Sequence, residues 1–238
     1  MATTARPPTR HPQVLGVPGH SLSGHSDWAV NDDVRKIGKK GEERTAEALA
    51  SIATDGGPTI LHSLRLPMSG VDADIDHVVV AGRNVYVVDS KVWKPARYWT
   101  VGHVTRRGLE RVRFADKHTS EMALRALRSL LAANQVPAIV HVPTIVVWSS
   151  NETRPMHLGL YRPRGARSVA GEKFRRTVGR RFPHAPADPA IVQALYPLVG
   201  LAPLAKEQPS HAAGASQRPA LVFPRPSGRT ATPFVDEF

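Results

Sequence analysis

Residues 71–93 read VDADIDHVVVAGRNVYVVDSKVW, and this stretch decides the fold. It contains two runs rich in β-branched residues, which are typical of strands. A tight turn at residues 82 and 83 predicts that the two strands pair in antiparallel orientation. In that register Asp76 lies opposite Asp89, so the sequence predicts two carboxylates side by side at one end of the strand pair.

The second strand ends in charged residues after an apolar run. Residues 85–88 are apolar on both faces, which favours a central strand whose end meets solvent. Asp89 and Lys91 lie two residues apart, so they project from the same face of the strand. We expect Lys91 to orient or help deprotonate an attacking water through a lowered pKa, and to offset negative charge in the transition state.

The two carboxylates are the candidate metal ligands. Adjacent carboxylates repel each other unless a cation lies between them, and hard oxygen ligands suit Mg²⁺ or Mn²⁺. We therefore expect Asp76 and Asp89 to bind one of these ions. A solvated strand end or a structural salt bridge is the alternative.

A third acid comes from a predicted helix at about residues 31–53. Glu42 falls at helical spacing with Ala46 and Leu49, on the apolar stripe of this helix. A carboxylate that faces a core is costly unless it meets a cation or hydrogen-bond donors. Glu42 is therefore expected to complete the site or to anchor its lysine, with an ordinary surface glutamate as the alternative.

Three segments together resemble the nuclease-related domain (NERD) family, which is itself similar to the restriction-endonuclease-like or PD-(D/E)xK nucleases. The segments are GKKGEERTAEAL, DADIDHVVV and VYVVDSKVW. The resemblance covers about residues 36–150, with specific motifs only within 38–94, and implies a restriction-endonuclease-like fold. The residues that match the family's motifs are Gly41-Glu42, Ile75-Asp76-His77 and Asp89-Ser90-Lys91.

The resemblance implies a metal-dependent nuclease that hydrolyses phosphodiester bonds, with DNA favoured by family analogy. Its catalytic residues would be Glu42, Asp76, Asp89 and Lys91. The sequence departs from the family at Asp89, where Glu is commoner, and at Val92, where Asn is common. These departures leave open a non-catalytic nucleic-acid-binding module with a degenerate nuclease fold. A third hypothesis is that the protein is an interaction or scaffold protein.

The net charge of +12 favours a polyanionic partner, nucleic acid before an anionic membrane surface. Four arginines around a predicted hairpin are candidate contacts to nucleic-acid phosphates, with a solvated basic face as the alternative. They are Arg106, Arg107, Arg111 and Arg113.

The chain has no cysteine, which excludes disulfides, thiolate metal sites and a cysteine nucleophile. It shows no secretory signal, and its most apolar segment, residues 136–148, is too short and too interrupted to span a bilayer. We therefore expect a cytoplasmic protein with no membrane partner.

The order of elements predicts an α/β fold in which a mixed central sheet is flanked by helices. A disordered basic arm is expected at residues 1–30, a nuclease-like domain at 31–200 with weak signal after 150, and a disordered Pro/Ala-rich tail at 204–238. The expected strands are about 59–66, 72–80, 84–93 and 138–148, with a hairpin of 98–104 and 109–114 and further helices at 120–134 and 189–199.

Overall fold

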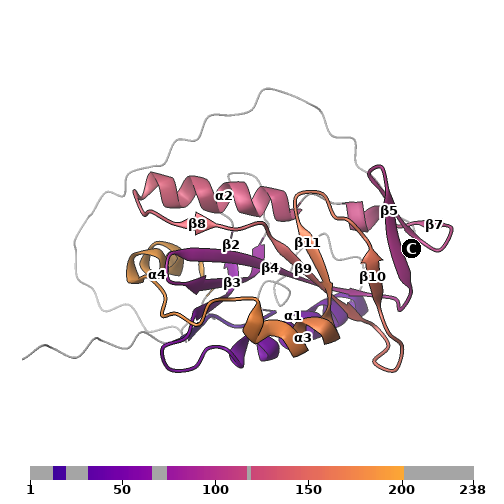
Figure 1. Cartoon of the computed structure of the whole chain (residues 1–238), viewed down its shortest axis with the longest axis horizontal. Coiled ribbons are helices and arrows are strands. Elements are labelled where there is room, and N and C mark those ends of the chain that lie inside the picture. Colours follow the sequence, from indigo (N-terminus) through magenta and orange to yellow (C-terminus); the bar gives the residue numbers. More distant parts are fainter. Residues whose placement is uncertain (1–12, 20–31, 66–73, 117–118, 201–238) are drawn as a thin grey trace, which may run out of the picture. The chain divides into compact units, whose positions relative to one another are not determined.

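The computed structural model describes residues 13–19, 32–65, 74–116 and 119–200. They form an α/β fold in which a mixed sheet is flanked by helices, as the sequence predicts (Figure 1). In this part of the chain the larger sheet has the strand order β1-β2-β3-β4-β9-β11, and β8 also pairs with β4. Its strands are β1 (Val14–Leu15), β2 (Thr59–Arg65), β3 (Asp74–Ala81), β4 (Asn84–Trp93), β8 (Ile139–Val140), β9 (Thr144–Ser149) and β11 (Arg167–Ala170).

A smaller sheet has the order β10-β5-β6-β7. Its strands are β5 (Arg97–Val101), β6 (Val104–Arg107), β7 (Glu110–Arg111) and β10 (His157–Leu160). The helices are α1 (Asp32–Ala50), α2 (Thr119–Ala133), α3 (Gly171–Thr177) and α4 (Pro189–Leu195), with short 3₁₀ helices η2 (Arg113–Asp116), η3 (Val178–Arg180) and η4 (Tyr196–Leu198). No helix in the described residues is both long enough and apolar enough to cross a membrane.

The β3–β4 hairpin has the register that the sequence predicts. Ala81 pairs with Asn84 and His77 with Val88, around a two-residue turn that begins at Gly82. Gly82 has a φ of 56°, in the left-handed region that favours glycine. The ladder ends at the pair of His77 and Val88, and Asp76 and Asp89 are the residues directly beyond this end on the two strands.

Beyond Val88, strand β4 pairs with a new neighbour. Residues Val88 to Trp93 pair in parallel with β9, so β4 lies between β3 and β9 at the point where the hairpin ladder ends. Val85 and Val88 are fully buried, as expected for a central strand with two apolar faces. The charged residues of β4 therefore begin where its antiparallel partner is lost.

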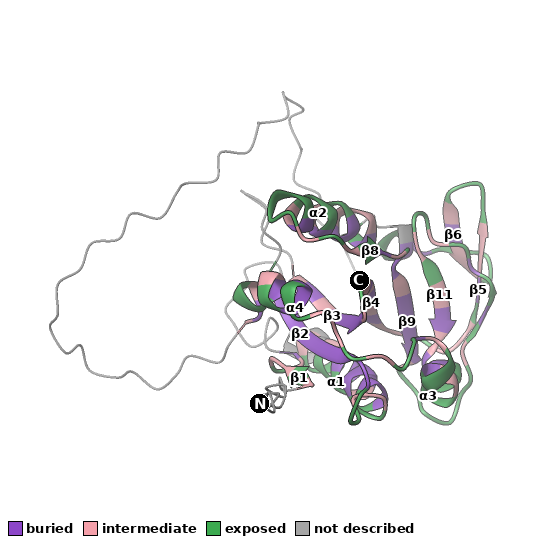
Figure 2. Ribbon diagram, turned by 60° about the vertical axis from the view of Figure 1, so that its left-hand side comes forward, coloured by how far each residue is buried: buried purple, intermediate pink, exposed green. Residues whose placement is uncertain are grey.

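Two pairs of helices cover opposite faces of the larger sheet (Figure 2). Leu49 of α1 and Phe174 of α3 pack with Val79 and Val88 on one face. Helices α2 and α4 pack on the other face, where the alternate residues of the same strands point. A third cluster joins the smaller sheet to the end of β4 through the buried rings of Trp93, Tyr98 and Tyr161.

Two expected strands differ in detail. The hairpin at residues 97–107 turns at Gly102, where φ is 59°, and not at residues 105–108, which belong largely to β6. The expected strand at 138–148 is divided into β8 and β9, and Pro143, which has no N–H to donate, lies in the break.

Residues 13–19 differ from the predicted N-terminal arm. Val14 and Leu15 form β1, which pairs in parallel with Ile60 and Leu61 of β2. The Ser63 hydroxyl also donates to the carbonyl of Val17. The rest of the predicted arm and the predicted tail at 204–238 lie outside the described residues.

Candidate active site

The structure brings the predicted site residues together at the point where β3 and β4 separate. The main-chain N–H of Ser90 on β4 donates to Oδ2 of Asp76 on β3, at 2.6 Å. Asp89 and Lys91 flank Ser90 in the sequence, and Nζ of Lys91 lies 2.8 Å from Oδ1 of Asp89. Asp76 therefore binds the main chain of the segment that carries the other two groups.

Glu42 reaches this point because α1 lies very close to β4. A Cβ atom added to Gly41 would come within 2.4 Å of Cγ2 of Val92, so glycine permits the close approach. Glu42 is 5% exposed, and its Oε2 accepts a hydrogen bond from the N–H of Gly19 at 2.9 Å. The Gly-Glu pair thus combines close packing with a buried carboxylate.

Gly19 is a site residue that the sequence reading missed. It lies in the segment read as an arm, and its φ of 73° is in the left-handed region. The sequence signal that marks it is weak: a glycine after a proline, in a stretch without periodicity.

Burial and mutual repulsion shift the pKa values of two of the carboxyl groups. Burial, together with the charge of Asp76, raises the pKa of Glu42 from 4.5 to about 8. Burial, together with the charge of Asp89, raises the pKa of Asp76 to about 7, although the Lys91 ammonium opposes this shift. The charges of Asp89 and Lys91 act on both Glu42 and Asp76, so the three carboxyl groups and Lys91 form one charged cluster.

The pKa of Lys91 is shifted in the direction opposite to the expected one. Burial lowers its pKa, but the charges of Asp89, Asp76 and Glu42 outweigh burial and raise it above the ordinary value of 10.5. Among these protein groups Lys91 is therefore a protonated ammonium. The expectation of a lowered pKa was wrong for this arrangement, because three acids surround the amine.

The donor set fits a hard divalent cation. Oδ2 of Asp89 is buried and accepts no hydrogen bond, which is costly for a carboxylate oxygen. No group of three or more His, Asp or Glu side chains in the described residues has the spacing of a complete metal site. Mg²⁺ is nevertheless commonly held by one or two carboxylates plus water. Asp76 and Asp89 supply that number of ligands.

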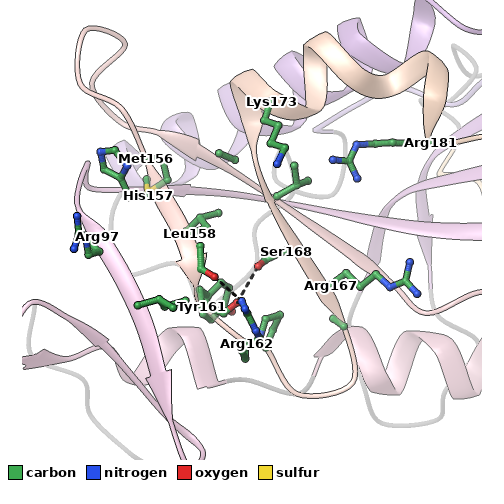
Figure 3. A pocket seen from close by; sticks show the side chains of 16 residues that line it. Arg97, Met156, His157, Leu158, Tyr161, Arg162, Arg167, Ser168, Lys173 and Arg181 are labelled. Carbon is green, nitrogen blue, oxygen red and sulfur yellow. Dashed lines mark hydrogen bonds between the residues drawn. The ribbon is translucent and has the colours of Figure 1, made fainter.

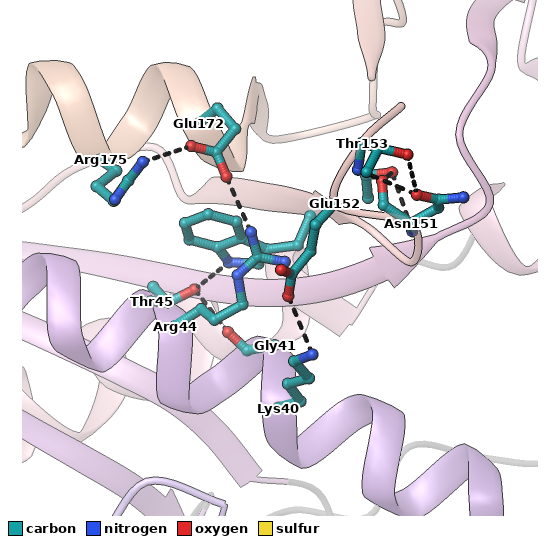
Figure 4. A network of polar contacts seen from close by, with 11 residues as sticks. Lys40, Gly41, Arg44, Thr45, Asn151, Glu152, Thr153, Glu172 and Arg175 are labelled. Carbon is teal, nitrogen blue, oxygen red and sulfur yellow. Dashed lines mark hydrogen bonds and ion pairs between the residues drawn. The ribbon is translucent and has the colours of Figure 1, made fainter. Parts of the chain in front are cut away.

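A buried hydrogen-bonded network lies behind this cluster, on the α1 face of the sheet. The indole N–H of Trp148 donates to Oγ1 of Thr45 at 2.8 Å, and Thr45 donates to the carbonyl of Gly41 (Figure 4). The network links α1 to β2, β3, β4 and β9. Its side chains are His62, His77, Ser90, Thr45 and Trp148, all of them buried.

The proton positions in this network follow from the hydroxyl groups. Thr45 donates its one proton to Gly41, so it accepts from Oγ of Ser90 at 2.8 Å. Ser90 then has no proton left for His77, so Nε2 of His77 donates across 3.0 Å. Burial lowers the pKa of His77, which makes the ring neutral and leaves its Nδ1 to accept from Nδ1 of His62 at 2.8 Å. His77 is thus a packed, hydrogen-bonded histidine.

Replacing Thr45 by valine is expected to lower the free energy of unfolding by about 2 kcal/mol, because the buried O–H of Ser90 and N–H of Trp148 lose their acceptor. Urea denaturation measures the change. Thr153→Val, at an exposed threonine, is the control and is expected to change the stability by less than about 0.5 kcal/mol. Equal stability of the two variants would contradict a contribution from the network.

The four arginines predicted to contact phosphates lie on β6, on β7 and at the start of η2. Arg107 forms an ion pair with Glu110 at 2.6 Å, and Arg106 donates to the carbonyl of Leu109. Two of the four are therefore engaged within their own hairpin. Nucleic-acid contact by Arg106, Arg107, Arg111 and Arg113 stays a prediction.

Comparison with known proteins adds one finding to this geometry. Neither a curated protein nor a solved structure matches the chain. The family model described as the nuclease-related domain matches residues 37–149. This range contains α1 from Ile37 onward, the β3–β4 hairpin and β9, and with them all four residues of the charged cluster. Residues 37–149 are thus similar to the nuclease-related (NERD) family, as the sequence motifs predict.

Proposed function

We propose that the protein is a divalent-metal-dependent nuclease that hydrolyses phosphodiester bonds, with DNA as the favoured substrate. The observation that carries the proposal is the convergence of Glu42, Asp76, Asp89 and Lys91 where β3 and β4 separate. A cluster in which the pKa values of Glu42, Asp76 and Lys91 are shifted is typical of a functional site. The nuclease-related domain supports the nucleic-acid substrate class.

Asp76 and Asp89 would hold Mg²⁺ or Mn²⁺. Burial raises the pKa of Asp76, and Oδ2 of Asp89 is buried without a hydrogen-bond donor, so a cation at this point would stabilise both carboxylates in their charged form. A divalent ion at such a site polarises a phosphoryl oxygen and makes water more acidic. Glu42, buried and hydrogen-bonded to Gly19, would act as an accessory acid whose ionised form adds to the negative field on Lys91.

Lys91 would stabilise charge in its protonated form. Its ammonium group is fixed by Asp89, and its side chain is 42% exposed, so it is accessible to a bound phosphate. A fixed cation beside the phosphorus atom offsets the negative charge that develops during hydrolysis. The ion pair with Asp89 favours this role over deprotonation of the attacking water.

Incubation with circular and linear DNA, with Mg²⁺, Mn²⁺ or EDTA, tests the proposal. We expect cleavage with either metal and none in EDTA. Circular substrate distinguishes internal cleavage from attack at ends. DNA binding without cleavage under all these conditions would overturn the nuclease proposal and leave the non-catalytic binding module.

A further inference from the structure

A basic groove lies outside the charged cluster, between β10, β11 and α3 (Figure 3). Its volume is about 770 Å³, within the range of ligand-binding clefts. Five arginine or lysine side chains line it, and no aspartate or glutamate does. The five are Arg97, Arg162, Arg167, Lys173 and Arg181, which we call the basic groove residues.

Three of the basic groove residues have no counter-charge. The side chains of Arg97, Arg167 and Lys173 make no hydrogen bond or ion pair with any other described residue. Arg181 is half-buried, and its Nε donates to the hydroxyl of Thr177 and not to an acid. Several like charges gathered around one groove repel each other, so an anion in the groove would be favoured.

The groove lies two strands away from the charged cluster in the larger sheet. Asp89 of β4 pairs with Ile145 of β9, and Ile145 pairs in turn with Ser168 of β11. Ser168 is one of the residues that line the groove. Two strand spacings separate the main chains of Asp89 and Ser168 by about 10 Å. A nucleic-acid strand carries one phosphate per about 3.4 Å of helix axis, so a bound strand of a few nucleotides covers this distance.

The groove also lies at two sheet edges. Among the described strands, β11 is at one edge of the larger sheet and β10 is at one edge of the smaller sheet. The lining includes apolar side chains, among them Leu158, Leu160 and Pro163. The groove therefore combines cationic and apolar side chains, and a positively charged groove is the feature that tracks a nucleic-acid backbone.

We propose that the basic groove binds the phosphodiester backbone of the nucleic-acid strand that the charged cluster cleaves. The identity of the ligand rests on the proposed function, whereas the existence of an anion-binding groove rests on its lining. Nucleic acid is favoured over an acidic peptide because the groove lies two strands from a nuclease-related active site. Most of its lining is C-terminal to residue 149, so the family match does not account for it.

Fluorescence anisotropy of a labelled single-stranded DNA oligonucleotide, with full-length protein in EDTA, tests the groove without cleavage. We expect Arg167→Ala and Lys173→Ala each to weaken binding several-fold and to reduce the slope of log K against log salt by about 0.7. Arg176→Ala is the matched control, because Arg176 is an exposed cation on α3 that does not line the groove. The DNA affinity of Arg176→Ala is expected to fall less than that of the two groove variants.

Three outcomes would overturn the inference. The first is equal binding by wild type, Arg167→Ala and Lys173→Ala, with unchanged melting temperatures. The second is displacement of DNA by poly-glutamate as effectively as by unlabelled DNA, which would indicate an acidic-peptide site. The third is equally effective displacement by inorganic phosphate, which would indicate a small-anion site.

The groove and the nuclease proposal fail in different ways. Groove variants that weaken DNA binding in a protein that never cleaves DNA would support the groove and exclude the enzyme. Metal-dependent cleavage of DNA, together with a DNA affinity that the groove variants leave unchanged, would support the nuclease proposal and exclude DNA binding by the groove.

Discussion

Replacement of Lys91 by methionine is expected to reduce DNA cleavage by about 100-fold or more, the usual cost of removing one group that stabilises transition-state charge. Methionine keeps the length and the apolar stem of the side chain but removes the ammonium that lies 2.8 Å from Asp89. The initial rate of plasmid cleavage with Mg²⁺ measures the effect. The affinity for DNA in EDTA is expected to change much less, because many other cations contribute to it.

Lys94→Met is the matched control for this prediction. Lys94 is an exposed lysine just after β4, and the same substitution there is expected to leave the cleavage rate within about 2-fold, as is usual for surface positions. Lys91→Arg keeps a cation beside Asp89 and is expected to retain more activity than Lys91→Met, though less than wild type, since a guanidinium is planar and bulky. Full cleavage by Lys91→Met would exclude the catalytic role of Lys91.

Replacement of Glu42 by glutamine is expected to stabilise the protein in EDTA at alkaline pH. In the folded state Glu42 keeps its proton up to a pKa of about 8, because it is buried beside Asp76. The unfolded chain releases that proton near its ordinary pKa of 4.5. The stabilising contribution of the protonated group is therefore complete below pH 4.5 and is lost as the pH rises through about 8. Glutamine mimics the protonated acid and still accepts from Gly19.

The measurement is urea denaturation of both proteins in EDTA between about pH 5 and about pH 9, where we expect the difference in unfolding free energy to grow by at least about 1 kcal/mol. His62 and His77 have lowered pKa values and affect stability in the opposite direction, but they are present in both proteins, so their contributions cancel. The difference therefore reports the titration of Glu42 together with its repulsion from Asp76. Mg²⁺ is expected to stabilise the wild type at alkaline pH by binding the folded state. A difference in unfolding free energy that does not depend on pH would contradict a raised pKa of the buried Glu42 carboxyl.

Local sequence patterns determined the hairpin and most of the charged cluster. Strand pairing through a two-residue turn is a short-range event, so β-branched runs around Gly82 were sufficient to predict the register of the hairpin, at whose end Asp76 and Asp89 lie. Helical periodicity likewise placed Glu42 on the buried face of α1. These inferences required only the geometry of single elements.

Only the tertiary structure decided which distant groups meet. The hydrogen bond from Gly19 to Glu42, the link from Thr45 to Ser90 and Trp148, and the basic groove all join residues far apart in the sequence. Such contacts depend on parallel pairing and on helix-to-sheet packing, which no local period encodes. The same long-range packing surrounds Lys91 with three acids and so raises its pKa, which the identities of its sequence neighbours alone did not predict.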